Sequence, residues 1–400
     1  MSVTSPAGFR AAGVTAGLKT SGRPDVALVV TEGPRHVAAA VLTSNRVHAA
    51  PVTWTRQAVK DGTARAVVLN SGGANACTGP EGFADTHRTA EHTAAALGAA
   101  GIGGEDGVGA GDVLVCSTGL IGVRLPMDLL LPGVDAAVAA LAADGGDAAA
   151  HAIMTTDTRS KQTLVTGETA GAGWSVGGMA KGAGMLAPGL ATMLCVLTTD
   201  ADVDAATADA ALRAATAATF DRVDSDGCMS TNDTVILLAS GASGATPSAA
   251  ELTRAVTAAC ADLARQLVAD AEGASHDIAI TVRGATTQDA ALAVARAVSR
   301  SNLFKAAIFG NDPNWGRVLS AVGTVPEDVA PFDALTLDVA VNGVQVCRAG
   351  GVGEPRELVD LAAAREVTVE VDLHAGDAEV TLWTNDLTHD YVHENSAYSS

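Results

Sequence analysis

Short apolar runs bounded by turn residues recur along this chain. They fall at residues 27–30, 38–43 and 65–70, and again at 193–197 and 234–240. Runs of this length between turn-forming residues are typical of strands that are buried on both faces. These five segments therefore predict strands in the core of the protein.

Alanine-rich segments with helical spacing of apolar residues separate these strands. Residues 83–97, 204–220 and 290–298 have this character, and another helical stretch ends at Met154. The clearest start signal is Ser248-Ala249-Ala250-Glu251, a capping box in which serine and glutamate satisfy backbone N–H groups at a helix start. The helix that follows is amphipathic, because one face collects Leu252, Val256, Leu263 and Leu267.

The last third of the chain shows the alternation of half-buried strands, at residues 278–282, 335–341, 367–373 and 380–384. A turn at Ala375-Gly376 predicts that the last two pair as a hairpin. The apolar residues 306–309 predict one more short strand. Strands that alternate with helices in this way predict a globular α/β protein.

Composition narrows the class of partner. The chain has 400 residues, 48% of them hydrophobic and 3% aromatic, which is enough for two large lobes. The net charge is −20, with 30 of the 45 acidic residues in the segment 192–400. Such a surface argues against nucleic acids and anionic membranes as partners, and an anionic substrate would need a local cation.

No signal peptide or membrane-spanning segment is evident in the sequence, so we expect a cytoplasmic protein. Six cysteines are scattered without the spacing of a metal site, which predicts buried free thiols, no disulfide and no metal; they are Cys77, Cys116, Cys195, Cys228, Cys260 and Cys347.

The glycine-rich stretch 177–194 carries the first candidate chemistry. Its glycines and Pro188 exclude a stable helix and predict a strained, turn-rich backbone that leads to Ala191-Thr192. The apolar run 193–197 follows at once, so Thr192 stands at the first position of a core strand. Taken alone, this pattern is more often an ordinary loop before a strand.

The alternative is self-cleavage. If the Thr192 hydroxyl attacks the carbonyl carbon of Ala191, the peptide becomes an ester, and hydrolysis leaves Thr192 as a new N-terminus. Its α-amine, with a usual pKa of about 7.7 to 8.0, can then serve as the general base for its own hydroxyl. Thr192 would thus be both the cleavage residue and the nucleophile of the mature protein.

Four other segments are rich in polar residues or glycine, and two of them admit a functional as well as a structural interpretation. The glycine-rich turn 70–79 is a ligand cradle or a tight connection. Residues 112–122 predict a strand that runs into a Ser-Thr-Gly turn, where Thr118 and Gly119 form either an oxyanion site or a plain turn. Thr155-Thr156-Asp157-Thr158 reads as a cap or turn cluster, and 224–233 reads as a capped turn because its spacing fails the calcium-loop pattern.

Several of these segments together resemble the ornithine acetyltransferase family, also called glutamate N-acetyltransferase, of arginine biosynthesis. The resemblance covers essentially the whole chain. Its most specific parts are Met179-Ala180-Lys181-Gly182-Ala183-Gly184-Met185 with Ala191-Thr192-Met193-Leu194, Cys116-Ser117-Thr118-Gly119, Asp312-Pro313-Asn314-Trp315-Gly316-Arg317, and Asn395 in the tail.

The resemblance implies self-cleavage between Ala191 and Thr192 into an α chain, 1–191, and a β chain, 192–400, which stay together in an α2β2 heterotetramer. It also implies layered sheets and helices, similar in architecture to N-terminal nucleophile hydrolases. No repeat or linker in the sequence offers a better boundary. The family often has Asn-Met at Gly189-Leu190, which bears on the rate of cleavage, and threonine where this chain has Ser400.

Carried over by position, the resemblance gives Thr192 the acetyl group and makes Thr118 and Gly119 the oxyanion hole. The residues implied to line the substrate site are Thr155, Lys181, Thr192, Glu272, Asn395 and Ser400. Lys181 suits a substrate carboxylate, and Glu272 suits a substrate ammonium, although a glutamate at a helix end is more often solvated.

We therefore expect acetyl transfer from N²-acetyl-L-ornithine to L-glutamate, without a cofactor. The sequence leaves open whether acetyl-CoA is an alternative donor. A self-processing amidohydrolase or aminopeptidase that uses water as acceptor is the first rival. A non-catalytic binding or structural protein, in which Thr192 only begins a strand, is the second.

Overall fold

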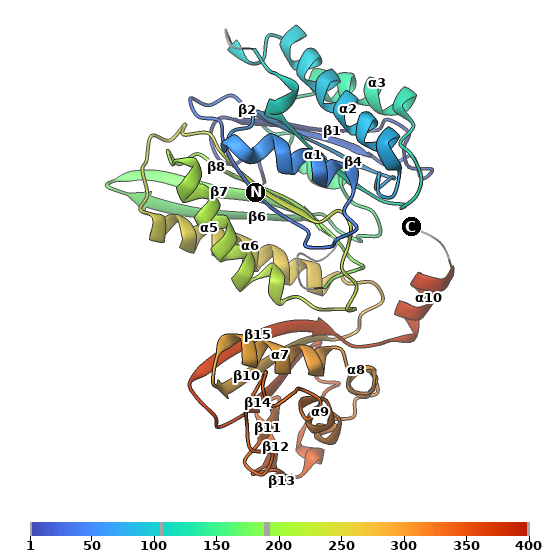
Figure 1. The fold of residues 1–400 in the computed structure, drawn as a ribbon, viewed down its shortest axis with the longest axis vertical. Helices are drawn as coiled ribbons and strands as arrows, with labels where there is room; N and C mark the ends of the chain where they lie inside the picture. The colour runs from blue at the N-terminus through green and yellow to red at the C-terminus, as the bar shows by residue number, and fades with distance from the viewer. Residues whose placement is uncertain (1, 105–106, 188–192, 398–400) are drawn as a thin grey trace.

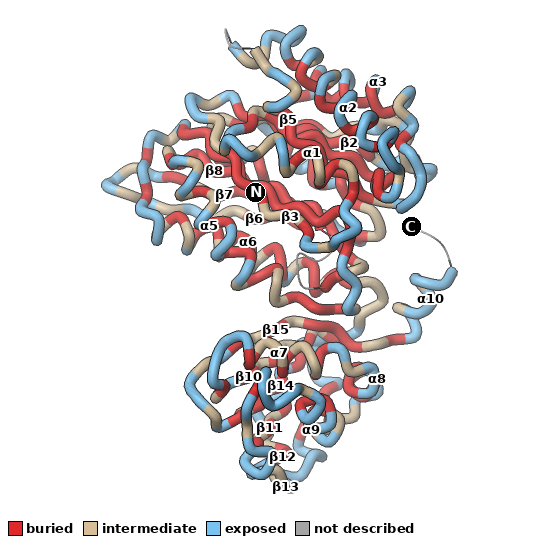
Figure 2. The backbone as a smooth tube through the Cα atoms, viewed as in Figure 1, coloured by how far each residue is buried: buried red, intermediate tan, exposed pale blue. Residues whose placement is uncertain are grey.

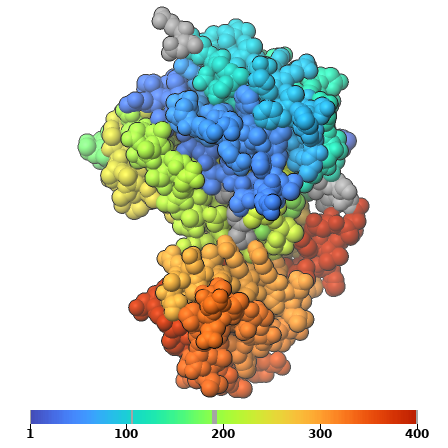
Figure 3. Space-filling model, in the orientation of Figure 1, coloured from blue at the N-terminus to red at the C-terminus, as the bar shows by residue number. Residues whose placement is uncertain are grey.

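The computed structural model describes residues 2–104, 107–187 and 193–397. Figure 1 shows two lobes, an upper lobe with two stacked sheets and a lower lobe built on a third sheet. The space-filling view narrows between the lobes, and the C-terminal segment lies beside this junction (Figure 3). No helix in these three described ranges has both the length and the apolar character needed to cross a membrane.

The first sheet of the upper lobe has the order β1-β2-β4-β5. Its outer face packs against α2 and α3, where Leu28 and Val68 meet Leu97 and Leu130. The elements of this layer are β1 (Phe9–Val14), β2 (Val26–Thr31), α1 (Ala50–Ala58), β4 (Ala66–Ser71), α2 (Gly79–Ala99), β5 (Val113–Thr118), α3 (Met127–Ala139) and α4 (Gly146–Ala152).

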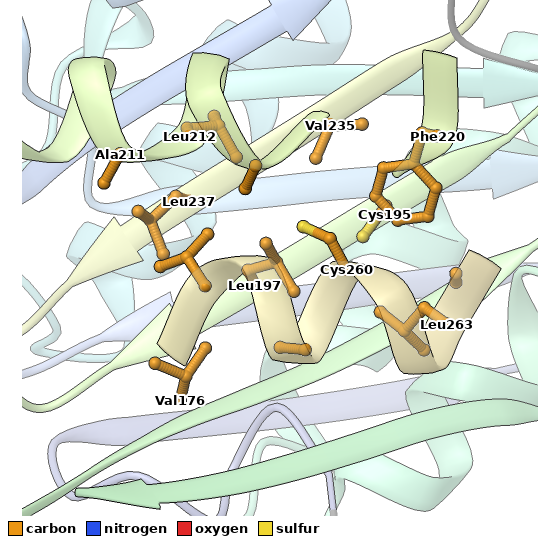
Figure 4. Close-up of a cluster of buried hydrophobic side chains, with 14 of the residues drawn as sticks. Val176, Cys195, Leu197, Ala211, Leu212, Phe220, Val235, Leu237, Cys260 and Leu263 are labelled. Atoms are coloured by element: carbon orange, nitrogen blue, oxygen red, sulfur yellow. The ribbon is translucent and has the colours of Figure 1, made fainter. Parts of the chain in front are cut away.

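The second sheet has the order β3-β9-β8-β7-β6 and is covered by α5 and α6. Figure 4 shows Leu197 and Cys195 of this sheet facing Leu263 and Cys260 of α6. The elements are β3 (Val37–Leu42), β6 (Lys161–Thr169), β7 (Ala172–Lys181), β8 (Leu194–Thr199), α5 (Ala205–Ala218), β9 (Thr234–Ala239) and α6 (Ala249–Ala269).

The inner faces of the two sheets share one core. Val29 and Leu69 of the first sheet belong to the same buried cluster as Val196 and Ile236 of the second. Both sheets are buried along most of their length (Figure 2). The upper lobe is therefore a helix–sheet–sheet–helix stack, which confirms the prediction of a layered α/β fold.

The third sheet, of order β13-β12-β11-β14-β10-β15, has its own core with three helices. Its elements are β10 (Asp277–Ala285), α7 (Gln288–Ser299), α8 (Asn302–Phe309), α9 (Trp315–Val322), β11 (Asp338–Val341), β12 (Val344–Arg348), β13 (Gly351–Val352), β14 (Glu366–Asp372) and β15 (Ala378–Asn385). A last helix, α10 (His389–Ala397), returns to the junction of the lobes (Figure 1).

Most predicted elements are confirmed, including the capping box at Ser248, whose hydroxyl accepts from the Glu251 N–H while the Glu251 carboxylate accepts from the Ser248 N–H. Cys116, Cys195, Cys260 and Cys347 are buried as predicted. The prediction of burial is wrong for the two exposed thiols, Cys77 and Cys228.

The predicted strand at 306–309 is wrong, because these residues end helix α8. Ser301 caps that helix by accepting from the N–H of Phe304 at 3.3 Å. Phe304, Ala307 and Ile308 then share its buried face. A four-residue apolar run does not distinguish a strand from the end of a buried helix.

The predicted hairpin of residues 367–373 and 380–384 is also wrong. Both segments are strands, but β10 lies between them, parallel to β14 and antiparallel to β15. The connection passes the end of β10, where the N–H of Ala375 donates to Gly284 O at 2.6 Å. The alternation of apolar and polar residues shows which face of a strand is buried, but it does not show which strand lies next to it in the sheet.

The stretch 177–194 is less irregular than predicted. Gly177 and Gly178 lie inside strand β7, and the turns begin at Gly182, whose φ is +154°. Strands β7 and β8 pair antiparallel, with Lys181 opposite Leu194. The predicted cleavage point thus falls between two neighbouring strands of one sheet, and Ala191 and Thr192 themselves lie outside the described residues.

Candidate active site

Strand β5 ends at Thr118, and Gly119 then takes a φ of +129°, which a residue with a side chain rarely adopts. A Cβ atom at position 119 would lie 2.6 Å from both Gly72 C and Gly73 N. The N–H of Gly72 also donates to Thr118 O at 2.9 Å. Two glycine-rich turns therefore approach each other so closely that position 119 requires glycine.

Two buried asparagines hold this turn. The Asn70 Oδ1 accepts from the Ser117 hydroxyl at 2.6 Å, and its Nδ2 donates to Gly73 O at 3.0 Å. The Nδ2 of Asn232 donates to Ser117 O at 2.8 Å and to Ala74 O at 2.6 Å. The segments 70–79 and 224–233 thus hold the Thr118-Gly119 turn in place. The sequence did not predict this role for either segment.

Lys181 ends strand β7 and is only 2% exposed. Its Nζ donates to the Thr118 Oγ1 at 3.2 Å. Burial lowers the pKa of Lys181, and the negative charge of Asp157 opposes that effect. A buried cation therefore stands directly beside the turn at Thr118.

Asp157 is the centre of a buried ionic network. Its carboxylate accepts from the Lys161 Nζ at 2.6 Å, and from the N–H groups of Gly182 at 2.7 Å and Thr155 at 2.9 Å. Burial alone would raise the pKa of Asp157, but the charges of Lys181 and Lys161 bring it down to about 2. Lys161 is 0% exposed and also pairs with Asp270 at 2.5 Å.

Glu272 follows helix α6 and is held from two sides, so it is not the freely solvated residue that its position suggested. Its Oε1 accepts from the Thr156 hydroxyl at 2.7 Å, and its Oε2 accepts from the Asn395 Nδ2 at 3.0 Å. A Cβ at Gly184 would come within 2.5 Å of this carboxylate. Small residues in the 182–184 turn thus leave room for Glu272.

Helix α10 brings Asn395 to this place by packing on the turn after Glu272. The Thr388 hydroxyl donates to Gly273 O at 2.6 Å, and a Cβ at Gly273 would lie 2.2 Å from Tyr391 N. The Asp386 carboxylate accepts from the N–H groups of Ser275 and His276 at 2.9 and 3.0 Å. These contacts fasten the C-terminal segment where the lobes join.

A cavity of about 220 Å³ joins these parts. Six of the residues predicted from the sequence line it: Thr118, Gly119, Thr155, Lys181, Glu272 and Asn395. Thr192, Ala191 and Ser400 lie outside the described residues. In the described ranges no group of three or more histidine, cysteine, aspartate or glutamate side chains is placed to hold a metal ion.

Asp233 is a neighbour of the cavity that the sequence did not single out. It is 0% exposed, and its Oδ1 accepts from the Met193 N–H at 3.2 Å. Burial raises the pKa of Asp233 well above its usual value. No partner of its Oδ2 is found among the described residues. Met193 directly follows Thr192 in the sequence.

The cavity wall suits acyl transfer. A hydroxyl and a backbone N–H at the end of a strand are the donors that stabilise the oxyanion of a tetrahedral intermediate. The family comparison agrees with this chemistry, since the model of the ArgJ family matches residues 10–400. The chain belongs to the ArgJ family.

Individual relatives in this family match along the whole chain. The "Arginine biosynthesis bifunctional protein ArgJ" of Streptomyces coelicolor is 63% identical over 400 residues, which is 100% of both chains. The protein of the same name from Thermobifida fusca is 61% identical, again over 100% of both. A solved ornithine acetyltransferase from Mycobacterium tuberculosis, complexed with ornithine, is 59% identical over 48% of this chain and 96% of its own, with a TM-score of 0.45.

Proposed function

We propose that this chain cleaves itself between Ala191 and Thr192 and then transfers the acetyl group of N²-acetyl-L-ornithine to L-glutamate. Whole-length relatives named as bifunctional arginine biosynthesis proteins support this function. The observation that carries it is the cavity itself, where the Thr118-Gly119 turn, Lys181 and Glu272 meet next to the start of strand β8.

The first half of the reaction is acetylation of Thr192. The α-amine of Thr192 takes the proton of the hydroxyl, and the oxygen attacks the acetyl carbonyl carbon. The Gly119 N–H and the Thr118 hydroxyl donate to the oxyanion. The carbon–nitrogen bond breaks, the proton passes to the leaving nitrogen, and ornithine departs.

The second half regenerates the enzyme. The amine of glutamate attacks the acetyl ester, the same donors stabilise the oxyanion, and the Thr192 oxygen leaves and regains its proton. Aminolysis of the acetyl ester by glutamate must be faster than its hydrolysis by water, so the amine has to be held close to the ester. Lys181 is the cation for a substrate carboxylate, and Glu272 pairs with the ammonium of the ornithine side chain.

The two chains should remain associated after cleavage. Strand β7 precedes the predicted cut and strand β8 follows it, yet the two pair over six residue positions from Val176↔Thr199 to Lys181↔Leu194. Strand β3 pairs with β9 across the same divide. We propose that two such pairs form an α2β2 heterotetramer and that the protein acts in the cytoplasm. The scheme needs no cofactor, and acetyl-CoA is an alternative donor to include in the assay.

Ornithine release with and without glutamate tests the acceptor. We expect about one ornithine per active site without glutamate, followed by a slow rate, and repeated turnover when glutamate is added. The reason is that the acetyl ester waits for an amine. Rapid ornithine release that does not depend on glutamate would favour the amidohydrolase, and the transferase proposal would be wrong.

A further inference from the structure

The hydrogen bond between Lys181 and Thr118 determines which of the two groups is the donor. An ammonium group has three donors and no acceptor, so the Thr118 Oγ1 must be the acceptor of the 3.2 Å hydrogen bond from Lys181 Nζ. The hydroxyl keeps one proton to donate. Thr118 is 4% exposed, and it donates that proton to no side chain or carbonyl in the described part of the chain.

The Thr118 hydroxyl lies at the cavity in which acyl transfer would take place. Thr118, Gly119 and Lys181 line the same cavity, and the Lys181 Nζ lies 3.2 Å from the Thr118 hydroxyl oxygen. A hydroxyl that accepts from a cation is also a stronger donor, because hydrogen bonds in a chain polarise one another in a low-dielectric site. The oxygen that develops charge in acyl transfer is the acceptor such a donor suits.

We propose that Lys181 is a positioning residue for the oxyanion hole: it turns the Thr118 hydroxyl proton into the cavity and polarises it. This inference rests on the proposed acetyl transfer and gives Lys181 a task besides holding a substrate carboxylate. The two tasks differ in a measurable way. Loss of a carboxylate contact raises KM, whereas loss of a polarised oxyanion donor lowers the rate of acetylation.

The surroundings of Lys181 act on its charge in opposite directions. The charged and titratable groups that act on it come from several elements: Asp157, Lys161, Glu272, Asp233 and Lys19. Asp157 favours the ammonium form and burial opposes it. The acetylation rate should therefore fall at high pH as Lys181 loses its proton, and Lys181→Arg, which stays charged, should move that fall to higher pH.

A double-mutant cycle tests the inference. Single-turnover acetylation of the cleaved enzyme by acetylornithine is measured for Lys181→Met, Thr118→Val and the double variant. We expect Thr118→Val to slow acetylation about 100-fold, Lys181→Met about 10- to 100-fold, and the double variant about 100-fold, because the lysine acts through the hydroxyl. Independent effects that multiply in the double variant would overturn the inference.

A donor without a carboxylate removes the rival explanation. N-acetyl-1,4-diaminobutane is acetylornithine without its α-carboxylate, and p-nitrophenyl acetate also lacks the ammonium. Lys181→Met should slow acetylation by both donors about 10- to 100-fold, as it does with acetylornithine. If Lys181→Met is acetylated by these donors at the normal rate, the inference is wrong, and the role of Lys181 is limited to binding the substrate carboxylate. If Lys181→Met cleaves itself too slowly to yield the mature enzyme, the same comparison is made on the slowed rate of self-cleavage, which also forms an oxyanion.

Lys161→Met is the matched control, because Lys161 is also buried and also interacts with Asp157, but its Nζ donates to Asp157 and Asp270 rather than to Thr118. Lys161→Met should change the acetylation rate by the same factor whether or not Thr118→Val is present. Separate results would contradict the proposed acetyl transfer and the role of Lys181. A wild-type protein that takes no acetyl group contradicts the proposed function, whereas normal acetylation with no coupling between Lys181 and Thr118 contradicts only this inference.

Discussion

Gly119→Ala should slow acetyl transfer by about 100- to 1000-fold, the usual cost of losing an oxyanion donor. The φ of Gly119 is +129°, and the added Cβ would lie 2.6 Å from the backbone of Gly72 and Gly73. The turn has to move, and the Gly119 N–H moves with it. The readout is kcat for ornithine release in the presence of glutamate.

Gly122→Ala separates this effect from backbone strain. Gly122 lies three residues further on with a φ of +84°, and a Cβ there would meet nothing within 4 Å. We expect about 1 kcal/mol of destabilisation and a nearly unchanged kcat. An equal loss of activity in both variants, or a fully active Gly119→Ala, would show that the turn at 118–119 is not part of the active site.

Asp157→Asn should destabilise the fold by about 3 kcal/mol, since it leaves Lys181 and part of the charge of Lys161 without their buried counter-charge. Urea unfolding of the uncleaved Thr192→Ala form, in which one chain unfolds, is the measurement. Asp147→Asn is the control, because the Asp147 side chain is 71% exposed and should matter by less than about 0.5 kcal/mol. Equal stability of the two variants would contradict the central position of Asp157.

The same residue predicts a dependence on acid. The pKa of Asp157 is about 2 in the folded protein against a usual 3.8, so the folded state binds its proton less readily than the unfolded state does. Its stabilisation is complete above about pH 4 and is lost as the pH falls toward 2. Asp157→Asn should lack this part of the pH dependence.

Much of the layered core could be predicted, because its strands are continuous apolar runs and its long helices carry caps and one apolar face. Residues 194–199 and 234–239 are examples in which the whole strand is buried. The errors have a common cause. The pairing of β10 between β14 and β15, and the helical state of residues 306–309, depend on neighbours that are distant in the sequence.

The active site was also predicted only in part. The resemblance named six residues that the structure brings around one cavity, although their roles remain predictions. The residues that hold them in place were missed. Asp157, Asn232 and Asp233 lie in polar turns that resemble ordinary caps in the sequence. Their contacts with Lys161, Ser117 and Met193 exist only in the folded chain. The one available signal was an aspartate placed directly before the buried strand 234–239.

The central claim is that Thr192 is first the cleavage residue and then the carrier of the acetyl group. Mass spectrometry of the purified protein, before and after mixing with acetylornithine alone, tests both parts. We predict two chains, 1–191 and 192–400, and one acetyl group on Thr192 that glutamate removes. A single chain of about 40 kDa that Thr192→Ala leaves unchanged, or an acetyl group on another residue, would contradict it.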